Sequence, residues 1–385
     1  MFKENLEKEV SEFLKQCTGC GKCMKACPLP ESDQMLIRSL NYATYKKSLP
    51  TAKTIEFAQK CIQCGACNIE CPANCHREKM MLWLKTRLSN SLPKGYKNAL
   101  KYKGSRLSFF QKIGRYFALK KLEPVAGELK KHVDKKDFKE TPLLFYLGDS
   151  IYSPSLAQHK LIAIAEYMNK DFEILAGYKY SNGIQHYYAG LLDEADKMHD
   201  VLYDAVLKVN PATVVTITGE DYEAMKHLQK HWGLNFILKT ATEWLLDNVN
   251  KLNLKGEKQK VTFHDSCILG RKENKKALPR ELLDKVCTIV DIPQDKGLCL
   301  CCGFLRGEHE PDSLQRMQTK KLEQVKTKNM SVECINCWNK LAPAAEQKNI
   351  KLTDVISLVY SALEEEIKEE QAKEAEQIRE EDMEE

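Results

Sequence analysis

Residues 17–28 read CTGCGKCMKACP, and residues 61–72 read CIQCGACNIECP. Both stretches place four cysteines in one spacing, C-x2-C-x2-C-x3-C-P, where x is any residue. The chain has 16 cysteines in 385 residues: nine lie between Cys17 and Cys75, seven between Cys267 and Cys337, and none in between. Cysteine chemistry is therefore expected in two zones, which are separated by a long stretch without thiols.

The spacing of the two N-terminal runs resembles that of bacterial ferredoxins. Three cysteines at three-residue intervals wrap one face of a cubane [4Fe–4S] cluster, whereas the fourth cannot easily turn back and ligates the other cluster. The pattern predicts a first cluster on Cys17, Cys20, Cys23 and Cys71. It predicts a second cluster on Cys61, Cys64, Cys67 and Cys27. The alternative, structural zinc, usually pairs two C-x2-4-C knuckles across a longer loop and fits this spacing poorly.

The sequence around these runs indicates a helical domain over residues 1–90. MLIRSLNYATYKKSL, residues 35–49, is expected to form a helix between the runs. The arrangement is similar to that of succinate dehydrogenase iron–sulfur subunits, in which a ferredoxin-type module is built into helices. Cys75 is left over and is interpreted as a structural thiol near the first cluster.

Two further segments are defined by their charge. Residues 91–140 are expected to be a basic helical linker, because nine Lys or Arg and no Asp or Glu lie between Lys94 and Lys121. A solvated linker and a surface helix that faces a membrane or a membrane partner both stay open. Nucleic-acid binding is not expected, since no binding-fold signature accompanies the charge. Residues 364–385, with twelve acidic and three basic residues, are expected to be an acidic tail.

After Thr141 the pattern changes to alternating strands and helices. Strands are predicted at 143–148, 212–218, 261–267, 287–292 and 330–334, and helices at 155–170, 220–232, 277–286, 312–328 and 338–348. This alternation is typical of a mostly parallel α/β architecture. It also indicates an internal duplication, with one half over 141–255 and a second over 256–363. The predicted fold class is α+β multidomain: a helical 2[4Fe–4S] ferredoxin-type domain followed by two α/β halves.

The second half carries the other cysteine motif. Cys267 is followed after 33 residues by Cys301-Cys302-Gly303, and 31 residues separate Cys302 from Cys334-x2-Cys337. This motif resembles the CCG domain of heterodisulfide reductase catalytic subunits, which also occurs in the iron–sulfur subunits of glycolate and lactate oxidases. Together with the ferredoxin runs, the whole chain is similar to the fused type of heterodisulfide reductase subunit.

The resemblance implies a non-cubane iron–sulfur cluster in the second half. Its ligands would be Cys267, Cys301, Cys302, Cys334 and Cys337. Zinc on the last four of these cysteines is the alternative. Cys287 and Cys299 do not fit the motif and are interpreted as buried thiols. His264 either serves the cluster, as a donor to sulfur or a proton carrier, or makes an ordinary structural hydrogen bond.

The first half departs from the family pattern because it contains no cysteine. GDS (148–150), KYSNG (179–183), and Thr218 with Asp221 stand where the family has its cysteines. We expect this half to keep the fold and to lack the cluster. Heterodisulfide reduction in the family uses two such clusters, so the resemblance does not transfer that reaction to this chain.

The sequence contains no P-loop and no G-x-G-x-x-G, so partners are expected to supply nucleotide or flavin chemistry. The first hypothesis is an electron-transfer subunit that relays electrons through two cubanes to or from the CCG cluster. The alternatives are a thiol–disulfide reductase acting at that cluster, and a two-cluster relay with structural zinc. Whether the chain is itself an enzyme stays open.

The resemblance suggests partners: a flavoprotein or other redox subunits, and a membrane cytochrome b–quinone module. The charged start MFKENLEKEV and the lack of an 18-residue apolar run predict a cytoplasmic protein, with a peripheral place at the inner membrane face as an option.

Overall fold

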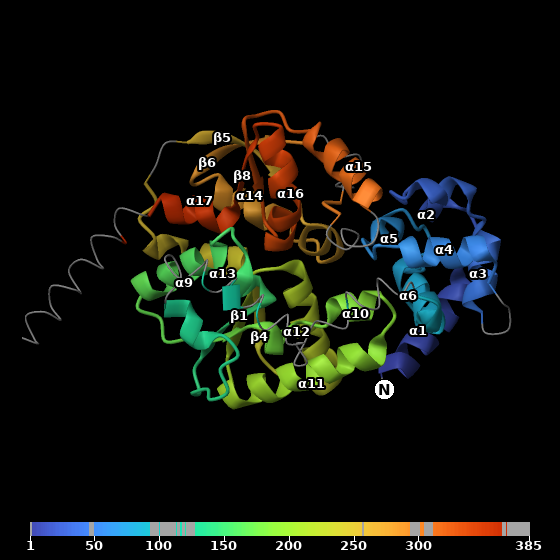
Figure 1. Ribbon diagram of the computed structural model, residues 1–385, viewed down its shortest axis with the longest axis horizontal. Helices are drawn as coiled ribbons and strands as arrows, with labels where there is room; N and C mark the ends of the chain where they lie inside the picture. Colours follow the sequence, from blue (N-terminus) through green and yellow to red (C-terminus); the bar gives the residue numbers. More distant parts are fainter. Residues whose placement is uncertain are drawn as a thin grey trace, which may run out of the picture.

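A computed structural model describes residues 2–45, 50–92, 128–255, 258–292, 301–303 and 311–363, with a few single residues outside these ranges. Within them the chain forms an N-terminal helical part followed by two four-stranded parallel sheets (Figure 1). The predicted fold class is thereby confirmed. The 91–140 linker and the 364–385 tail lie largely outside the described residues; of the linker's aromatic side chains, Tyr116 and Phe117 are described and exposed.

The N-terminal part consists of short helices that surround one central helix. The helices are α1 (Phe2–Gln16), α2 (Lys22–Lys25), η1 (Pro30–Gln34), α3 (Ile37–Thr44), α4 (Ala52–Lys60), α5 (Ala66–Ile69), α6 (Arg77–Arg87) and η2 (Ser89–Ser91). The helix predicted between the cysteine runs is α3. Helix α6 is the central one, because Met80 and Leu82 pack with α1 whereas Met81 and Leu84 pack with α3 and α4.

The first sheet has the strand order β2-β1-β3-β4, and all its neighbours are parallel. The central strand β1, LLFYLG, is fully buried, as expected for a parallel strand covered by helices on both faces. The elements of this half are η3 (Glu128–His132), β1 (Leu143–Gly148), η4 (Asp149–Tyr152), α9 (Ala157–Tyr167), β2 (Glu173–Ala176), η5 (Tyr178–Tyr180), α10 (Ile184–Tyr188), α11 (Leu192–Val209), β3 (Thr213–Thr216), α12 (Gly219–Trp232), β4 (Ile237–Thr240), α13 (Ala241–Asp247) and η6 (Val249–Lys251).

The second sheet repeats this topology with the order β6-β5-β7-β8. The repeated order agrees with the predicted duplication. The elements of this half are β5 (Gln259–His264), η7 (Cys267–Lys272), α14 (Ala277–Leu283), β6 (Cys287–Asp291), α15 (Pro311–Leu322), β7 (Asn329–Val332), α16 (Ile335–Gln347), β8 (Lys351–Asp354) and α17 (Val355–Ser361). The strand predicted over 261–267 ends at His264, and Cys267 instead begins the π-helical turn η7.

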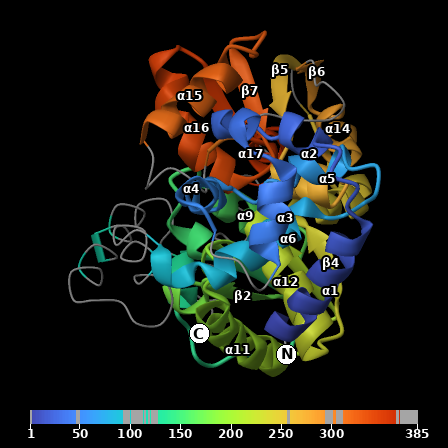
Figure 2. The ribbon, with the colours of Figure 1, turned by 90° about the vertical axis from the view of Figure 1, so that its right-hand side faces the viewer.

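The two sheets share one hydrophobic core. Phe145 and Trp244 of the first half belong to the same buried cluster as Phe263, Leu283 and Val359 of the second half. Figure 2, turned by 90°, shows the N-terminal helices lying across the junction of the two halves. They contact the first half through a second buried cluster, in which Leu6 and Met80 meet Tyr188. The carboxyl ends of the strands, where α/β proteins place their functional groups, are therefore close to the ferredoxin-type part.

Three strands were not predicted: β2 (EILA), β4 (ILKT) and β8 (KLTD). Each has four residues, and β4 and β8 are edge strands in which polar residues interrupt the apolar pattern. Such short segments carry too little periodicity to be recognised. The predicted domain boundaries stay predictions. Among the helices described, none combines the length and the apolar character that a membrane crossing requires.

Candidate iron–sulfur centres

The cysteines predicted for the first cluster lie together, although Cys71 comes from the second run. Burial raises the pKa of the Cys23 thiol, and the neighbouring Cys17 and Cys71 thiols add to the rise. Cys17 in turn interacts with Cys20, which is exposed to solvent. The chain therefore folds so that Cys71 returns to the loop that carries the first three cysteines.

A buried arginine faces this group. Arg77, the first residue of α6, is 2% exposed, and its Nη2 donates to Cys17 Sγ over 3.4 Å and to Asn41 Oδ1 over 2.7 Å. Its Nε and Nη1 have no hydrogen-bond partner among the described residues. A buried guanidinium beside Cys17 and Cys23 fits a centre that carries net negative charge, as a cluster with four thiolate ligands does.

The cysteines predicted for the second cluster are grouped in the same crossed way. Burial raises the pKa of Cys67 well above its usual value, and Cys64, Cys61 and Cys27 are among the neighbours that add to the rise. Cys27 comes from the first run, so the two runs exchange their fourth cysteines. Gly21 and Gly65, at φ +76° and +74°, directly precede the short helices α2 and α5 and give the two loops one backbone shape.

The five CCG cysteines come from three separate segments and also meet. Cys267 begins η7, Cys301 and Cys302 precede Gly303 at φ +85°, and Cys334 caps α16, with Cys337 in its first turn. The pKa of Cys267 is raised well above its usual value, first by its contact with Cys301 and then by burial. Contacts with Cys302 and Cys334 raise the pKa of the Cys337 thiol. The ligand roles of all thirteen cysteines stay predictions.

The first half supplies groups to the CCG site that sequence reasoning missed. Glu220, at the start of α12, is 5% exposed. Its Oε2 accepts a hydrogen bond from Asn336 Nδ2 over 2.8 Å and one from the Cys334 thiol over 3.8 Å. The Gly219 N–H also donates to Cys334. Glu220 directly follows Gly219 in the turn after β3, but only the fold shows that this turn reaches the other half.

The remaining cysteines lie largely as expected. Cys75 is buried, and its backbone N–H donates to Cys71 Sγ over 3.3 Å, which places it beside the first group. Cys287 is a buried thiol in β6, and Cys299 lies outside the described residues. In the part of the chain described, no three His, Cys, Asp or Glu side chains are grouped as they would be around a single metal ion.

Among the described residues, His264 lacks the structural hydrogen bond that was the ordinary interpretation of it. The side chain is 1% exposed, and neither ring nitrogen has a hydrogen-bond partner among the described residues. Burial lowers its pKa well below the usual value, and the nearby Lys321 lowers it further. A role of His264 toward the CCG site stays a prediction.

In the first half, a polar network occupies the position of the CCG site. Thr218 caps α12 and Asp221 lies in its first turn, as Cys334 and Cys337 do in α16. Asp221 accepts hydrogen bonds from Thr218 Oγ1 over 2.6 Å and from Asn182 Nδ2 over 2.8 Å. Asn182 thus pairs with Asp221 as Cys302 pairs with Cys337.

The strand register gives the counterpart of the remaining cysteine. Tyr146 pairs with Thr216 in the first sheet, and His264 pairs with Val332 in the second. Thr216 and Val332 each lie two residues before the residue that caps the next helix, so Tyr146 corresponds to His264. Asp149 then corresponds to Cys267. Oxygens and an amide stand where the second half has thiols, which supports the expectation that this half holds no cluster.

Replacing Asp221 by alanine is expected to lower the free energy of unfolding by about 1–3 kcal/mol, because Asn182 and Thr218 lose a buried partner. The iron content per chain is expected to stay unchanged. Asp221→Asn, which retains an acceptor, is the control and is expected to cost less. Denaturant unfolding and iron analysis check this result, and loss of iron in Asp221→Ala would show that the first half does hold a centre.

Comparison with known proteins agrees with these groupings. Residues 9–72 match the family model of the 4Fe-4S dicluster domain, and residues 261–342 match that of the cysteine-rich CCG domain. The chain is therefore an iron–sulfur, oxidoreductase-like electron-transfer protein that joins a dicluster ferredoxin domain to a CCG domain. The dicluster domain implies two [4Fe–4S] clusters, and the CCG domain is a type associated with iron–sulfur clusters.

Curated relatives belong to the same class. The chain is 25% identical over 246 residues to the probable iron-sulfur-binding oxidoreductase FadF of Bacillus subtilis, and 26% identical over 259 residues to EtfAB:quinone oxidoreductase of Syntrophomonas wolfei. Each match covers 60% of this chain and 35% of the relative. One of the subunits of the fumarate reductase (CoM/CoB) of Methanothermobacter marburgensis is 22% identical over 158 residues, which are 39% of this chain and 32% of that relative. The chain thus spans about a third of the length of these relatives.

Proposed function

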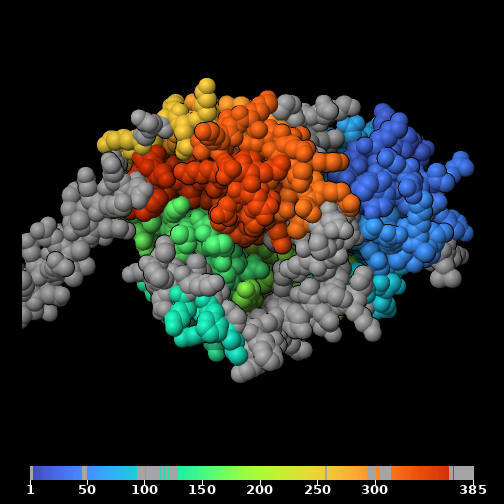
Figure 3. All heavy atoms as spheres, turned by 45° about the horizontal axis from the view of Figure 1, so that its top comes forward, coloured from blue at the N-terminus to red at the C-terminus, as the bar shows by residue number. Residues whose placement is uncertain are grey.

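We propose that this chain carries electrons between its two ferredoxin-type centres and the CCG site, as one subunit of a redox complex. The observation that carries the proposal is that Cys64 and Cys301 lie in the same buried cluster. These residues, from the second ferredoxin-type group and from the CCG group, lie in one buried apolar cluster with Ile62, Ala66 and Met317. Figure 3 shows the N-terminal part and the α15 region lying against each other at the surface.

The three cysteine groups form a series. The first and second groups are neighbours because each takes its fourth cysteine from the other's run, and the second group reaches the CCG group through Cys64. Bound iron–sulfur clusters supply one-electron chemistry. The protein contributes the spacing between the centres and the burial that excludes water from around Cys64 and Cys301.

Partners at both ends are part of the proposal. The name of the relative EtfAB:quinone oxidoreductase pairs EtfAB with a quinone, and this chain matches about a third of that protein. We propose a flavoprotein or another redox subunit as the donor or acceptor at one end. A membrane cytochrome b–quinone module at the other end, with the chain on the cytoplasmic side, would complete the path.

A cavity favours thiol–disulfide chemistry as a second candidate function. Its volume is about 650 Å³, and Cys301 is part of its wall. Lys25, Arg316 and Lys320 make it basic. A disulfide that entered here would reach the CCG site, and its reduction to two thiols would take up two electrons and two protons. The non-cubane form of the CCG centre is likewise proposed, with zinc as the alternative.

Metal analysis with low-temperature EPR tests the relay. Protein purified and reconstituted without oxygen is expected to hold clearly more than about eight irons per chain, since two cubanes account for about eight. Cys301→Ser and Cys302→Ser should remove only the excess iron and its signal. After reduction with dithionite, the CCG signal should change together with the cubane signals. About eight irons plus zinc would overturn the relay to the CCG site, and a signal change on adding thiol would favour the second candidate.

A further inference from the structure

We infer that Arg271 is a positioning residue for electron exchange: it holds the Cys64 loop against the CCG site and makes the second ferredoxin-type centre easier to reduce. This inference rests on the proposed relay. With clusters bound, one electron would pass between the centre at Cys64 and the CCG centre, and no bond would be made or broken. The original reductant is an external low-potential donor, which is dithionite in the experiment below.

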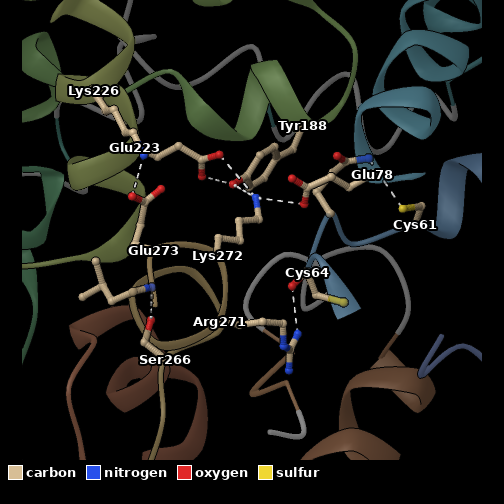
Figure 4. Close-up of polar contacts among 12 residues, drawn as sticks. Cys61, Cys64, Glu78, Tyr188, Glu223, Lys226, Ser266, Arg271, Lys272 and Glu273 are labelled. Carbon is tan, nitrogen blue, oxygen red and sulfur yellow. Dashed lines mark hydrogen bonds and ion pairs between the residues drawn. The ribbon is translucent and has the colours of Figure 1, made fainter. Parts of the chain in front are cut away.

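Arg271 links the two centres directly. It lies in η7, four residues after the predicted ligand Cys267, and its Nη1 donates to the backbone oxygen of Cys64 over 2.8 Å (Figure 4). The charge of Arg271 also lies near the thiols of both Cys64 and Cys267. One side chain therefore contacts the second centre from within the CCG motif.

The next residue fixes the turn that carries Arg271. Lys272 Nζ donates to Tyr188 Oη over 2.8 Å, and it pairs with Glu223 Oε1 at 3.3 Å and with Glu78 Oε2 at 3.5 Å. Tyr188 and Glu223 belong to the first half, and Glu78 belongs to α6 of the ferredoxin-type part. Figure 4 shows the ammonium group of Lys272 between these side chains. The turn is thus attached to all three parts of the molecule.

The Cys64 loop has no room to move toward this turn. A Cβ atom added to Gly65 would lie 3.2 Å from Lys272 Cγ and 3.1 Å from Glu78 Oε2. Gly65 also has φ +74°, a conformation that other residues adopt with strain. The close packing and the Arg271 hydrogen bond act on adjacent residues, so the position of Cys64 relative to η7 is determined on two sides.

Two physical effects follow from this geometry. Electron tunnelling falls steeply with distance, so a loop held against Cys301 exchanges electrons faster than a loose one. A cation and hydrogen bonds near an iron–sulfur centre stabilise its reduced, more negative form and raise its reduction potential. Arg271 supplies the positive charge to the second centre, and its hydrogen bond to the Cys64 carbonyl oxygen fixes where that charge lies. The first centre has Arg77 as its own buried cation.

The test is an EPR redox titration of the full-length, reconstituted Arg271→Gln and Arg271→Lys proteins. Arg271→Gln should keep its iron content and its thermal midpoint. The equilibrium constant for reducing the second cubane should fall about tenfold, which lowers its reduction potential by about 59 mV for a one-electron couple. The reduction potential of the first cubane should not change. The magnetic interaction between the second cubane and the CCG centre should also weaken. Arg271→Lys, which keeps the charge but not the fork, should shift less in the same direction.

Lys226→Gln is the matched control. Lys226 pairs with Glu273 at 2.6 Å in the same region, but its side chain is 53% exposed and its partner is a carboxylate rather than a predicted ligand, so neither cubane should shift. An Arg271→Gln protein with full iron and unshifted signals would overturn the inference, as would equal shifts of both cubanes. If Arg271→Gln does not fold, Arg271→Lys decides by the same criterion. Failure of the relay itself would be visible in the unmutated protein, as a CCG signal that does not respond while the cubanes are reduced.

Discussion

Cys27→Ser is expected to abolish the second cubane and to leave the first, although Cys27 belongs to the first cysteine run. Cys27 lies with Cys61, Cys64 and Cys67, whereas the other cysteines of its own run lie with Cys71. A hydroxyl is a poor substitute for a thiolate on iron, so the iron content per chain should fall by about four. The signal that remains should be the one that interacts least with the CCG centre.

Cys71→Ser is the reciprocal variant and should remove the first cubane instead. Iron and sulfide analysis with EPR of the dithionite-reduced proteins distinguishes the two outcomes. If Cys27→Ser removed the first cubane, the two runs would each hold their own cluster, and the crossed arrangement would be wrong. Cys75→Ser serves as a control, since Cys75 is buried beside the first group without being a predicted ligand.

Replacing Lys272 by methionine should destabilise the protein by about 3–5 kcal/mol, because it leaves two buried carboxylates without their cation. The side chains of Lys272, Glu78 and Glu223 are only 10%, 16% and 14% exposed. Although burial opposes a charge on Lys272, Glu223 and Glu78 hold its pKa above the usual value. Methionine fills a similar volume, so the loss reports charge rather than packing.

Denaturant unfolding of the reconstituted protein measures this loss. Adding Glu223→Gln to Lys272→Met should recover part of the stability, since one unpaired carboxylate is then removed. The exposed pair Lys226–Glu273 offers the comparison: Lys226→Met should cost at most about 1 kcal/mol. A Lys272→Met protein as stable as the unmutated one would show that the two carboxylates are solvated or protonated in the folded state.

The sequence predicted those features that depend on local pattern. The cysteine spacing indicated both ferredoxin runs, and the matches to the dicluster and CCG domain models support that interpretation. The alternation of apolar strands and amphipathic helices indicated two α/β halves, because a buried strand such as LLFYLG is a continuous apolar run. The absence of cysteines from 141–255 led directly to the expectation of a half without a cluster.

Contacts between distant segments could not be predicted in this way. Arg77, Arg271 and Glu220 each reach a predicted ligand from another cysteine run or another half, and their local sequence does not predict these contacts. A basic residue within five positions of a cysteine motif was the only signal for the two arginines. The sequence indicated only that Asn182 and Asp221 stand where the family has cysteines. It could not predict the hydrogen bond between them, because that bond depends on strand register.

The core shared by the two sheets limits how far this chain can be shortened. A fragment starting near residue 256 would contain all five CCG cysteines but would uncover Phe263, Leu283 and Val359, which pack in one cluster with Phe145 and Trp244. It would also lose Glu220 from beside Cys334. Apolar surface of that kind causes aggregation rather than folding. The smallest soluble piece that keeps the CCG cysteines in place is therefore expected to begin before β1, with the cysteine-free half as the second wall of its core.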